Sequence, residues 1–167
     1  MRKVIVVGDK KDELIPQLGK YDFEVTTDRE DADFVISYGG DGTLIKSEND
    51  YPGIPKIALR ASRICKKCSY RSNEEVLEVI KKGRYSLQNM IKLEAVHKED
   101  STEGFNEITL KNVNPRHAIR YELAIDDKWI QHEIIGDGVV VATPFGSTGY
   151  YRSITRSFIY DGIGLAI

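Results

Sequence analysis

The chain has 167 residues, which is enough for one domain of ordinary size or two small ones. Hydrophobic residues make up 41% and charged residues 30%, a composition typical of a soluble globular protein and not of a disordered one. The net charge of −2 gives no electrostatic basis for a nucleic acid partner. No apolar run approaches the ~18 residues of a membrane-spanning helix, and two cysteines without a secretory signal predict a cytoplasmic protein.

The first half of the chain alternates predicted strands and helices. Its first strand, Val4–Val7, is apolar without alternation, which is typical of a parallel strand buried on both faces. Asn73 is the predicted N-cap of a helix that Gly83 ends, and Thr43 is the predicted N-cap of a shorter one. The predicted strands cover residues 4–7, 23–26, 34–37 and 56–59, and the predicted helices cover 11–18 and 74–82.

The second half consists of short β-type runs with no helix of comparable quality between them. Asp126-Asp127 lies between two of these runs, where a tight hairpin turn would be. An α/β segment followed by a mostly-β segment predicts two domains, residues 1–88 and 89–167. The predicted strands cover residues 90–97, 105–111, 118–125, 129–135 and 138–143.

A glycine-rich loop, Tyr38-Gly39-Gly40-Asp41-Gly42-Thr43, follows the apolar run 34–36. Its glycines permit positive φ and the close approach of another molecule, and successive backbone N–H groups in such a turn suit phosphate oxygens. Asp41 is the only ionisable side chain of the loop. A carboxylate among phosphate-binding groups suits a residue that takes a proton or holds a metal ion on a phosphate. The alternative is a plain turn, because Gly-Gly and Asp-Gly are common turn formers.

Two later stretches carry groups that suit a nucleoside. The segment 136–150 brackets an apolar strand with Asp137-Gly138 and a loop of Gly, Ser, Thr and Tyr150, which can hold a ribose and stack a base. Asn106-Glu107 stands at the predicted start of a strand, where both side chains can reach one ligand only if the start is irregular. Alone, these stretches are equally compatible with a hairpin loop and a solvated strand end.

In this order the three stretches resemble the NAD kinase family, which phosphorylates the adenosine ribose 2′-hydroxyl of NAD to give NADP. The glycine-rich motif alone is shared with diacylglycerol kinases and phosphofructokinases, whereas Gly-Ser-Thr-x-Tyr points to NAD kinases. The resemblance implies a Rossmann-like α/β domain followed by a mostly-β NAD-binding domain. It implies ATP or polyphosphate as donor with Mg or Mn, and a homo-oligomer, dimer or tetramer. By the same resemblance Asp41 is the catalytic base, Gly39, Gly40, Gly42 and Thr43 bind the donor phosphates, and Asn106, Glu107, Asp137, Thr148, Gly149, Tyr150 and Ser153 bind NAD.

The chain departs from the family in three places. The wall segment 60–68 carries cations that either meet phosphates or are solvated, and Ile135 replaces a frequent basic residue. Cys65 and Cys68 form at most half a zinc site and are expected to be reduced thiols. The family's β domain continues past residue 167, so we expect a shortened domain with open edges and apolar surface. The alternative functions are a non-catalytic nucleotide sensor and a related sugar or lipid kinase.

Overall fold

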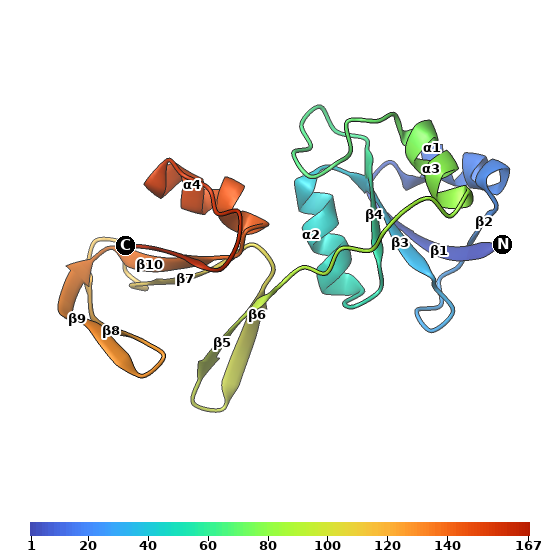
Figure 1. Cartoon of the computed structure of the whole chain (residues 1–167). Helices are drawn as coiled ribbons and strands as arrows, with labels where there is room; N and C mark the ends of the chain where they lie inside the picture. Colours follow the sequence, from blue (N-terminus) through green and yellow to red (C-terminus); the bar gives the residue numbers. More distant parts are fainter. The chain divides into compact units, whose positions relative to one another are not determined.

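The computed structural model describes all residues from 1 to 167, and they form two compact units, 1–88 and 89–167 (Figure 1). The first unit has a parallel sheet with helices, and the second is built mostly from antiparallel strands. The predicted fold class, an α/β part followed by a β part, is confirmed. Among the helices of the chain, none has the length and apolar character needed to cross a membrane.

The sheet of the first unit has four parallel strands in the order β2-β1-β3-β4. They are β1 (Arg2–Val7), β2 (Phe23–Val25), β3 (Phe34–Gly39) and β4 (Lys56–Arg60). The register pairs Val4 with Phe34 and Ile36 with Ile57, so β1 and β3 form the centre of the sheet. All four strands lie where the sequence predicts them, because these apolar runs are short and bounded by turn residues.

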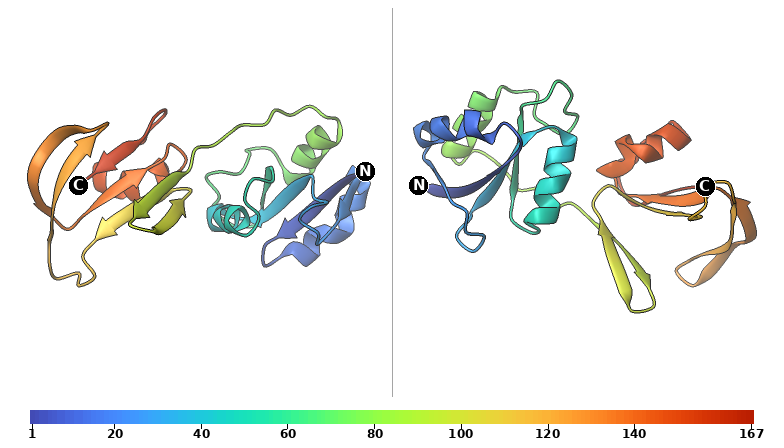
Figure 2. Two further views of the ribbon diagram at one scale, coloured as in Figure 1. Left: turned by 90° about the horizontal axis from the view of Figure 1, so that it is seen from below. Right: turned by 180° about the vertical axis from the view of Figure 1, so that it is seen from behind.

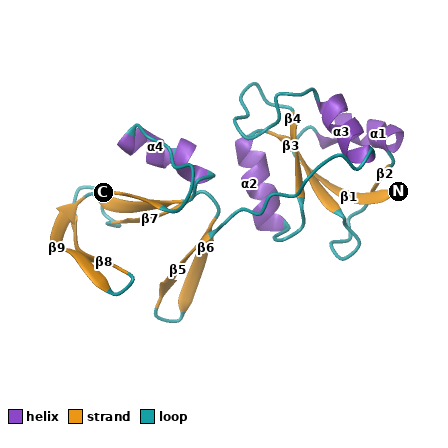
Figure 3. Cartoon of the chain, in the orientation of Figure 1, coloured by secondary structure: helices purple, strands orange, loops and turns teal.

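Helices cover this sheet (Figure 3). They are α1 (Lys11–Leu18), the 3-10 turn η1 (Gly19–Tyr21), α2 (Asp41–Asp50) and α3 (Asn73–Lys81). Leu18 of α1 and Leu77 of α3 pack in one core cluster with Val4 and Ile36 of the sheet. Because side chains alternate along a strand, Ile5 faces the opposite side of the sheet and is also buried. The sheet is therefore apolar on both faces, as its sequence predicts.

The N-cap of α3 is Ser72 and not Asn73. The Ser72 hydroxyl accepts the backbone N–H of Glu75, whose carboxylate accepts the N–H of Ser72, which forms a capping box. Asn73 instead exchanges two hydrogen bonds of 2.8 Å with the backbone of Arg60 and so ties α3 to the end of β4. The predicted stop at Gly83 is confirmed, because its φ is +67° and its N–H donates to the carbonyl of Ile80.

The second unit contains a three-stranded antiparallel sheet in the order β11-β10-β7 and two hairpins (Figure 2). The sheet comprises β7 (Glu107–Lys111), β10 (Gly138–Ala142) and β11 (Gly164–Ala166). The hairpins are β5 (Leu93–His97) with β6 (Asp100–Gly104) and β8 (Ile119–Ile125) with β9 (Lys128–Gly136). Asp126 and Asp127 both have positive φ, so the predicted tight hairpin turn is confirmed.

Sequence patterns missed two elements of this unit. Strand β6 is polar and carries no apolar alternation, so only its pairing with β5 reveals it. Helix α4 (Tyr150–Thr155) has six residues and follows the 3-10 turn η2 (Gly146–Thr148). The core cluster is small, with Val140, Ala142, Tyr151 and Ala166 buried. Many larger apolar side chains, including Leu110, Trp129 and Ile135, are more than half exposed.

Candidate functional site

The order of the strands in the first unit reverses between β1 and β3. In open α/β sheets, ligands bind outside the carboxyl ends of the strands at such a reversal. Here those ends are Gly8, directly after β1, and the glycine-rich loop after β3. Gly8 has a φ of +140°, and a side chain there would place its Cβ 2.1 Å from the carbonyl oxygen of Tyr38. The two strand ends therefore approach each other as closely as only glycine allows.

Two hollows of about 450 and 460 Å³ open at these strand ends, and Gly42 and Thr43 line both of them. One of them is lined by Asp9, Lys10 and Asp41 among others. Lys11, Lys46, Asp50 and Tyr51 line the other. Sequence reasoning missed residues 9 to 11, although the glycine directly after the first strand was a signal for them. The structure thus adds a charged segment after β1 to the predicted loop after β3.

The three glycines of the loop have different roles, and none of them has a positive φ. A Cβ on Gly39 would lie 2.1 Å from Oγ1 of Thr43, and a Cβ on Gly40 would lie 3.0 Å from the carbonyl of Ile64. Packing within the chain therefore requires glycine at position 39 and leaves little room for a side chain at position 40. A Cβ on Gly42 would meet no atom within 4 Å. Its backbone therefore borders open space that a ligand can enter.

Asp41 is the first residue of α2, and Gly40 is the N-cap. The expected cap, Thr43, lies inside the helix because the helix begins three residues earlier than predicted. The Oδ1 atom of Asp41 accepts the backbone N–H of Lys67 at 2.9 Å. The carboxylate thus lies at the positive end of the α2 dipole, next to the N–H groups that a helix leaves free in its first turn.

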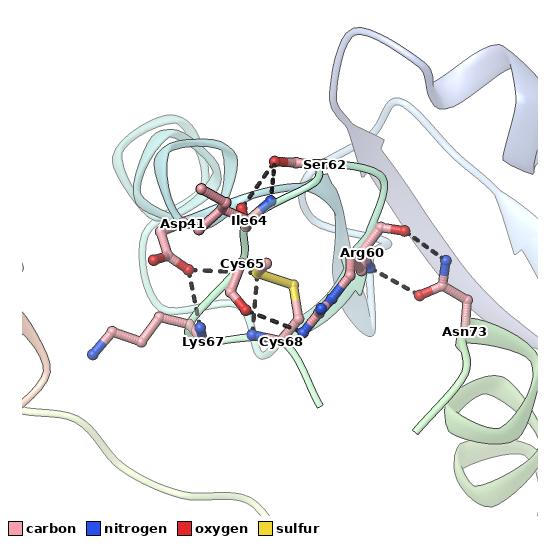
Figure 4. The surroundings of a disulfide bond; sticks show 8 residues. All are labelled: Asp41, Arg60, Ser62, Ile64, Cys65, Lys67, Cys68 and Asn73. Atoms are coloured by element: carbon pink, nitrogen blue, oxygen red, sulfur yellow. Dashed lines mark hydrogen bonds between the residues drawn. A yellow bond between two sulfur atoms is a disulfide. The ribbon is translucent and has the colours of Figure 1, made fainter. Parts of the chain in front are cut away.

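Cys65 and Cys68 are joined by a disulfide bond, so the expectation of two reduced thiols is wrong (Figure 4). The tight turn brings their Cα atoms to 5.4 Å, within the usual range for a disulfide. The Sγ atom of Cys65 lies 3.4 Å from Oδ1 of Asp41. This is a contact and not a hydrogen bond, because a disulfide sulfur carries no proton. No group of three or more His, Cys, Asp or Glu side chains in the chain is arranged to hold a metal ion.

The cations of the segment 60–68 are partly used by the segment itself. The guanidinium of Arg60 donates to the carbonyl of Cys65 at 3.1 Å. Burial lowers the pKa of Lys67, while the Asp41 carboxylate opposes this and the neighbouring Lys66 adds to it. Arg63 and Lys66 are exposed. The segment 60–68 is therefore held in shape by its own hydrogen bonds beside Asp41, with cations on its exposed side.

In the second unit, the loop 143–149 packs directly on Asn106 and Glu107. The Thr143 hydroxyl donates to the carbonyl of Phe105 at 2.9 Å and accepts the N–H of Gly146 at 3.0 Å. A Cβ on Gly146 would lie 2.0 Å from the carbonyl oxygen of Asn106, so the loop fits only with glycine there. The buried Ser147 hydroxyl donates to the carbonyl of Pro144 and accepts the N–H of Ile159.

Two side-chain oxygens in this region are buried without a hydrogen-bond partner, Oδ1 of Asn106 and Oε2 of Glu107. Burial also raises the pKa of Glu107. Asn106 directly precedes β7, so the pair stands at an irregular strand start. Gly149 lies beside Glu107, because its Cβ would be 3.7 Å from Oε2. Unpaired buried acceptors are costly, so this pair is suited to a ligand that donates hydrogen bonds.

A separate hollow of about 530 Å³ in the second unit is lined by Asp137 and Tyr150. Ile135, His117 and Thr109 are among its other lining residues. The structure therefore brings two of the predicted NAD-binding residues, Asp137 and Tyr150, together at this hollow. Asn106, Glu107 and Gly149 lie together at the loop 143–149 instead. Thr148 lies in η2. Ser153 lies in α4, where its hydroxyl donates to the carbonyl of Tyr150.

The fold, an α/β unit and a mostly-β unit, is similar to that of two solved kinase structures. The structure resembles yeast NADH kinase complexed with NADH, with a TM-score of 0.75 and 16% identity over 95% of this chain and 62% of that one. It also resembles an NAD kinase from Archaeoglobus fulgidus in complex with ATP, with a TM-score of 0.69 and 24% identity over 93% and 66%.

The sequence comparisons identify the family. A family model described as the ATP-NAD kinase C-terminal domain matches residues 105–160. The NAD kinase of Saccharolobus solfataricus is 38% identical over 135 residues, which are 80% of this chain and 52% of that protein. The NAD kinase of Methanothermobacter thermautotrophicus is 28% identical over 89% of this chain and 53% of its own length. The chain belongs to the NAD kinase family, and it spans about half the length of the curated relatives it matches.

Proposed function

We propose that this chain carries out NAD kinase chemistry, the transfer of a phosphoryl group to the adenosine ribose 2′-hydroxyl of NAD to give NADP. The observation that supports it best is the position of Asp41. Its carboxylate lies at the N-terminus of α2, in a hollow at the reversal point of a parallel sheet, beside a glycine with open space around it. This arrangement presents one acceptor among many backbone donors, which phosphoryl transfer to a hydroxyl requires.

The donor phosphates fit the glycine-rich loop. The first N–H groups of α2 have no partner in the helix and bind anions, and Gly42 and Thr43 border both hollows. We assign ATP to this loop, because a relative of similar fold holds ATP, and polyphosphate would offer the same phosphate groups. Gly39 and Gly40 allow the loop to fold, and Gly42 allows a phosphate to approach its backbone.

Asp41 is proposed to accept a hydrogen bond from the 2′-hydroxyl and to take its proton as the new bond to phosphorus forms. One carboxylate oxygen already accepts the Lys67 N–H, which fixes the orientation of the side chain. The other oxygen is available to the hydroxyl, because a carboxylate can accept about four hydrogen bonds. A general base of this kind contributes ~10²–10⁴ in rate.

NAD is proposed to contact the second unit through its hydroxyl and amide groups. The unpaired oxygens of Asn106 and Glu107 accept hydrogen bonds from a nucleoside, and Gly149 keeps the approach to Glu107 open. Asp137 and Tyr150 line a hollow large enough for part of a dinucleotide. Thr148 in η2 and Ser153 in α4 complete the proposed NAD-binding set.

A divalent ion, Mg or Mn, fits this proposal only as a partner of the donor phosphates. The chain has no cluster of three ligands, but Asp9 and Asp41 line the same hollow. Mg²⁺ is commonly bound through one or two carboxylates together with substrate phosphates and water. Bound there, the ion would neutralise charge on the phosphates, while Asp41 orients the hydroxyl.

The decisive test is NADP formation from NAD, ATP and Mg²⁺ by the wild type and by Asp41→Asn. We expect turnover to fall ~10²–10⁴-fold in the variant with little change in melting temperature. The control is Asp12→Asn, which removes an exposed carboxylate on α1 and should leave turnover unchanged. Near-normal turnover in Asp41→Asn would refute the role of this residue.

The same assay separates the alternative functions. If NAD raises the melting temperature but no NADP forms, the chain is a nucleotide sensor or needs further residues for turnover. If NAD neither binds nor reacts, sugar and lipid hydroxyls become the substrates to test.

We also propose that the protein is a homo-oligomer, a dimer or tetramer. The support is the exposed apolar surface of the second unit, where Leu110, Trp129 and Ile135 are each more than half exposed. Such side chains commonly become buried when subunits associate. Sedimentation analysis of the wild type and of Trp129→Glu tests this. A monomer in the wild type at micromolar concentration would refute the proposal.

A further inference from the structure

The proposed reaction leaves one chemical feature of the first unit unused, the disulfide bond beside Asp41. Both cysteines are buried, with exposed fractions of 7% for Cys65 and 8% for Cys68. Their neighbours Ile64 and Tyr70 are largely exposed, so the disulfide lies just beneath a surface turn. Figure 4 shows Asp41 approaching this turn from the start of α2.

The disulfide encloses the residue that holds Asp41. Lys67 lies between the two cysteines, and its N–H donates to Oδ1 of Asp41 at 2.9 Å. The N–H of Cys68 points to the sulfur of Cys65 at 3.1 Å, and Arg60 holds the carbonyl of Cys65. The covalent link therefore restricts the backbone that carries the Lys67 N–H, and through it the orientation of the carboxylate.

Reduction would change the surroundings of the same carboxylate oxygen. In the disulfide, the Cys65 sulfur is 3.4 Å from Oδ1 and has no proton to donate. In the dithiol, an S–H group at this distance becomes a second donor to Oδ1, which lowers the basicity of the carboxylate, and the turn is no longer closed covalently. The added donor makes Asp41 a poorer acceptor for the 2′-hydroxyl, and the open turn holds the carboxylate less firmly in place.

We propose that the Cys65–Cys68 disulfide is a positioning element for Asp41, so that the enzyme is active in the disulfide form and impaired in the dithiol form. This inference rests on the proposed function. The reductant is a dithiol: one of its thiolates attacks a sulfur of the pair, the S–S bond breaks, and a mixed disulfide forms. The second thiolate then releases the chain, which has gained two electrons and two protons as two thiols, and the reductant leaves as a disulfide.

The sequence offers a clean control, because Cys65 and Cys68 are the only two cysteines of the chain. Wild type is prepared in the disulfide form and again after treatment with a small dithiol, and alkylation with mass spectrometry counts the free thiols. The double variant Cys65→Ser/Cys68→Ser cannot respond to the dithiol. NADP formation is measured for all three, with kcat and KM for NAD and ATP determined separately.

We expect reduction to lower kcat on the order of 10-fold, because small displacements of a catalytic group have large effects on rate. The KM values should stay within about twofold, since substrate-binding groups are not altered. The double variant should have the kcat of the reduced wild type, and the dithiol should not change it. A kcat that is independent of the dithiol, or a double variant as fast as the disulfide form, would overturn the proposal. Two free thiols in the protein prepared without reductant would also overturn it.

A second readout does not depend on turnover and separates this inference from the proposed function. The exchange rate of the Lys67 backbone amide is measured by NMR in both redox forms and in Asp41→Asn. We expect exchange to accelerate about 10-fold or more in the dithiol form and in the variant, because the hydrogen bond to Oδ1 is weakened. If no form makes NADP, the proposed function fails, and this measurement still decides whether the disulfide holds Asp41. Equal exchange in both redox forms would refute the coupling.

Discussion

Replacing Gly42 with alanine separates the stability of the glycine-rich loop from its function. A Cβ at this position meets no atom within 4 Å, and the residue is helical, so the chain tolerates the methyl group. Near the start of a helix, Gly→Ala stabilises by about 0.5 kcal/mol, mainly by reducing the freedom of the unfolded chain. For a unit of this size 1 kcal/mol corresponds to ~4–8 °C, so the melting temperature should rise by about 2–4 °C.

The same methyl group should weaken the binding of the phosphate donor. It would project into the open space that we assign to the donor phosphates, at the cost of about one charge-assisted hydrogen bond, ~1.5–3 kcal/mol. This predicts a rise in the KM for ATP on the order of 10- to 100-fold. Scanning fluorimetry and the NADP assay at varied ATP measure the two effects.

Gly39→Ala is the matched control, because its Cβ would lie 2.1 Å from Oγ1 of Thr43. Overpacking of this kind destabilises by ~1–3 kcal/mol, so this variant should melt at a lower temperature than the wild type. If Gly42→Ala stabilises the protein and its KM for ATP is unchanged, the donor does not approach this backbone and the assignment is refuted.

Three further predictions concern charge and the second unit. Glu48→Gln should reduce the unfolding free energy by about 3 kcal/mol in urea titrations, because the side chains of the Glu48–Lys56 ion pair are each only 12% exposed. As a control, Asp31→Asn removes an exposed ion pair with Lys3 and should cost less than ~1 kcal/mol. Burial raises the pKa of Glu107, so the contribution of this group to stability is fully present below its ordinary value of 4.5 and is lost as pH rises through the raised value. Glu107→Gln should remove that fall in denaturation measured from acidic to neutral pH, and an unchanged profile would contradict the burial argument. Tyr150→Ala should weaken NAD binding in calorimetry while leaving the melting temperature nearly unchanged, because the side chain is 52% exposed beside the hollow; a large loss of stability would show a structural role instead.

Local patterns were sufficient for the parallel sheet and for the position of the glycine-rich loop. The strands of the first unit are short apolar runs between turn residues, and this signal does not depend on tertiary context. The same holds for the hairpin turn at Asp126-Asp127, where two residues with positive φ fit between alternating strands. Asn106 and Glu107 were predicted from the order of motifs, and the structure adds that one side-chain oxygen of each is buried without a partner.

The features that the sequence did not predict depend on contacts distant along the chain. Asn73 is a good N-cap by residue type, but its side chain is used by the backbone of Arg60, and Ser72 caps the helix instead. The disulfide depends on a turn whose shape the spacing alone does not specify. Strand β6 is polar throughout, so only the facing strand determines it.

The buried hydroxyls of Thr143 and Ser147 have a thermodynamic consequence for binding. Both are fully buried, and their hydrogen bonds to Phe105, Gly146 and Ile159 already order the loop 143–149 in the free protein. The conformational entropy of this loop is therefore lost when the chain folds and not when the proposed nucleotide binds. The same two hydroxyl groups thus stabilise the fold and order the loop for the proposed nucleotide. Removing either hydroxyl should lower both the stability of the fold and the affinity for that nucleotide.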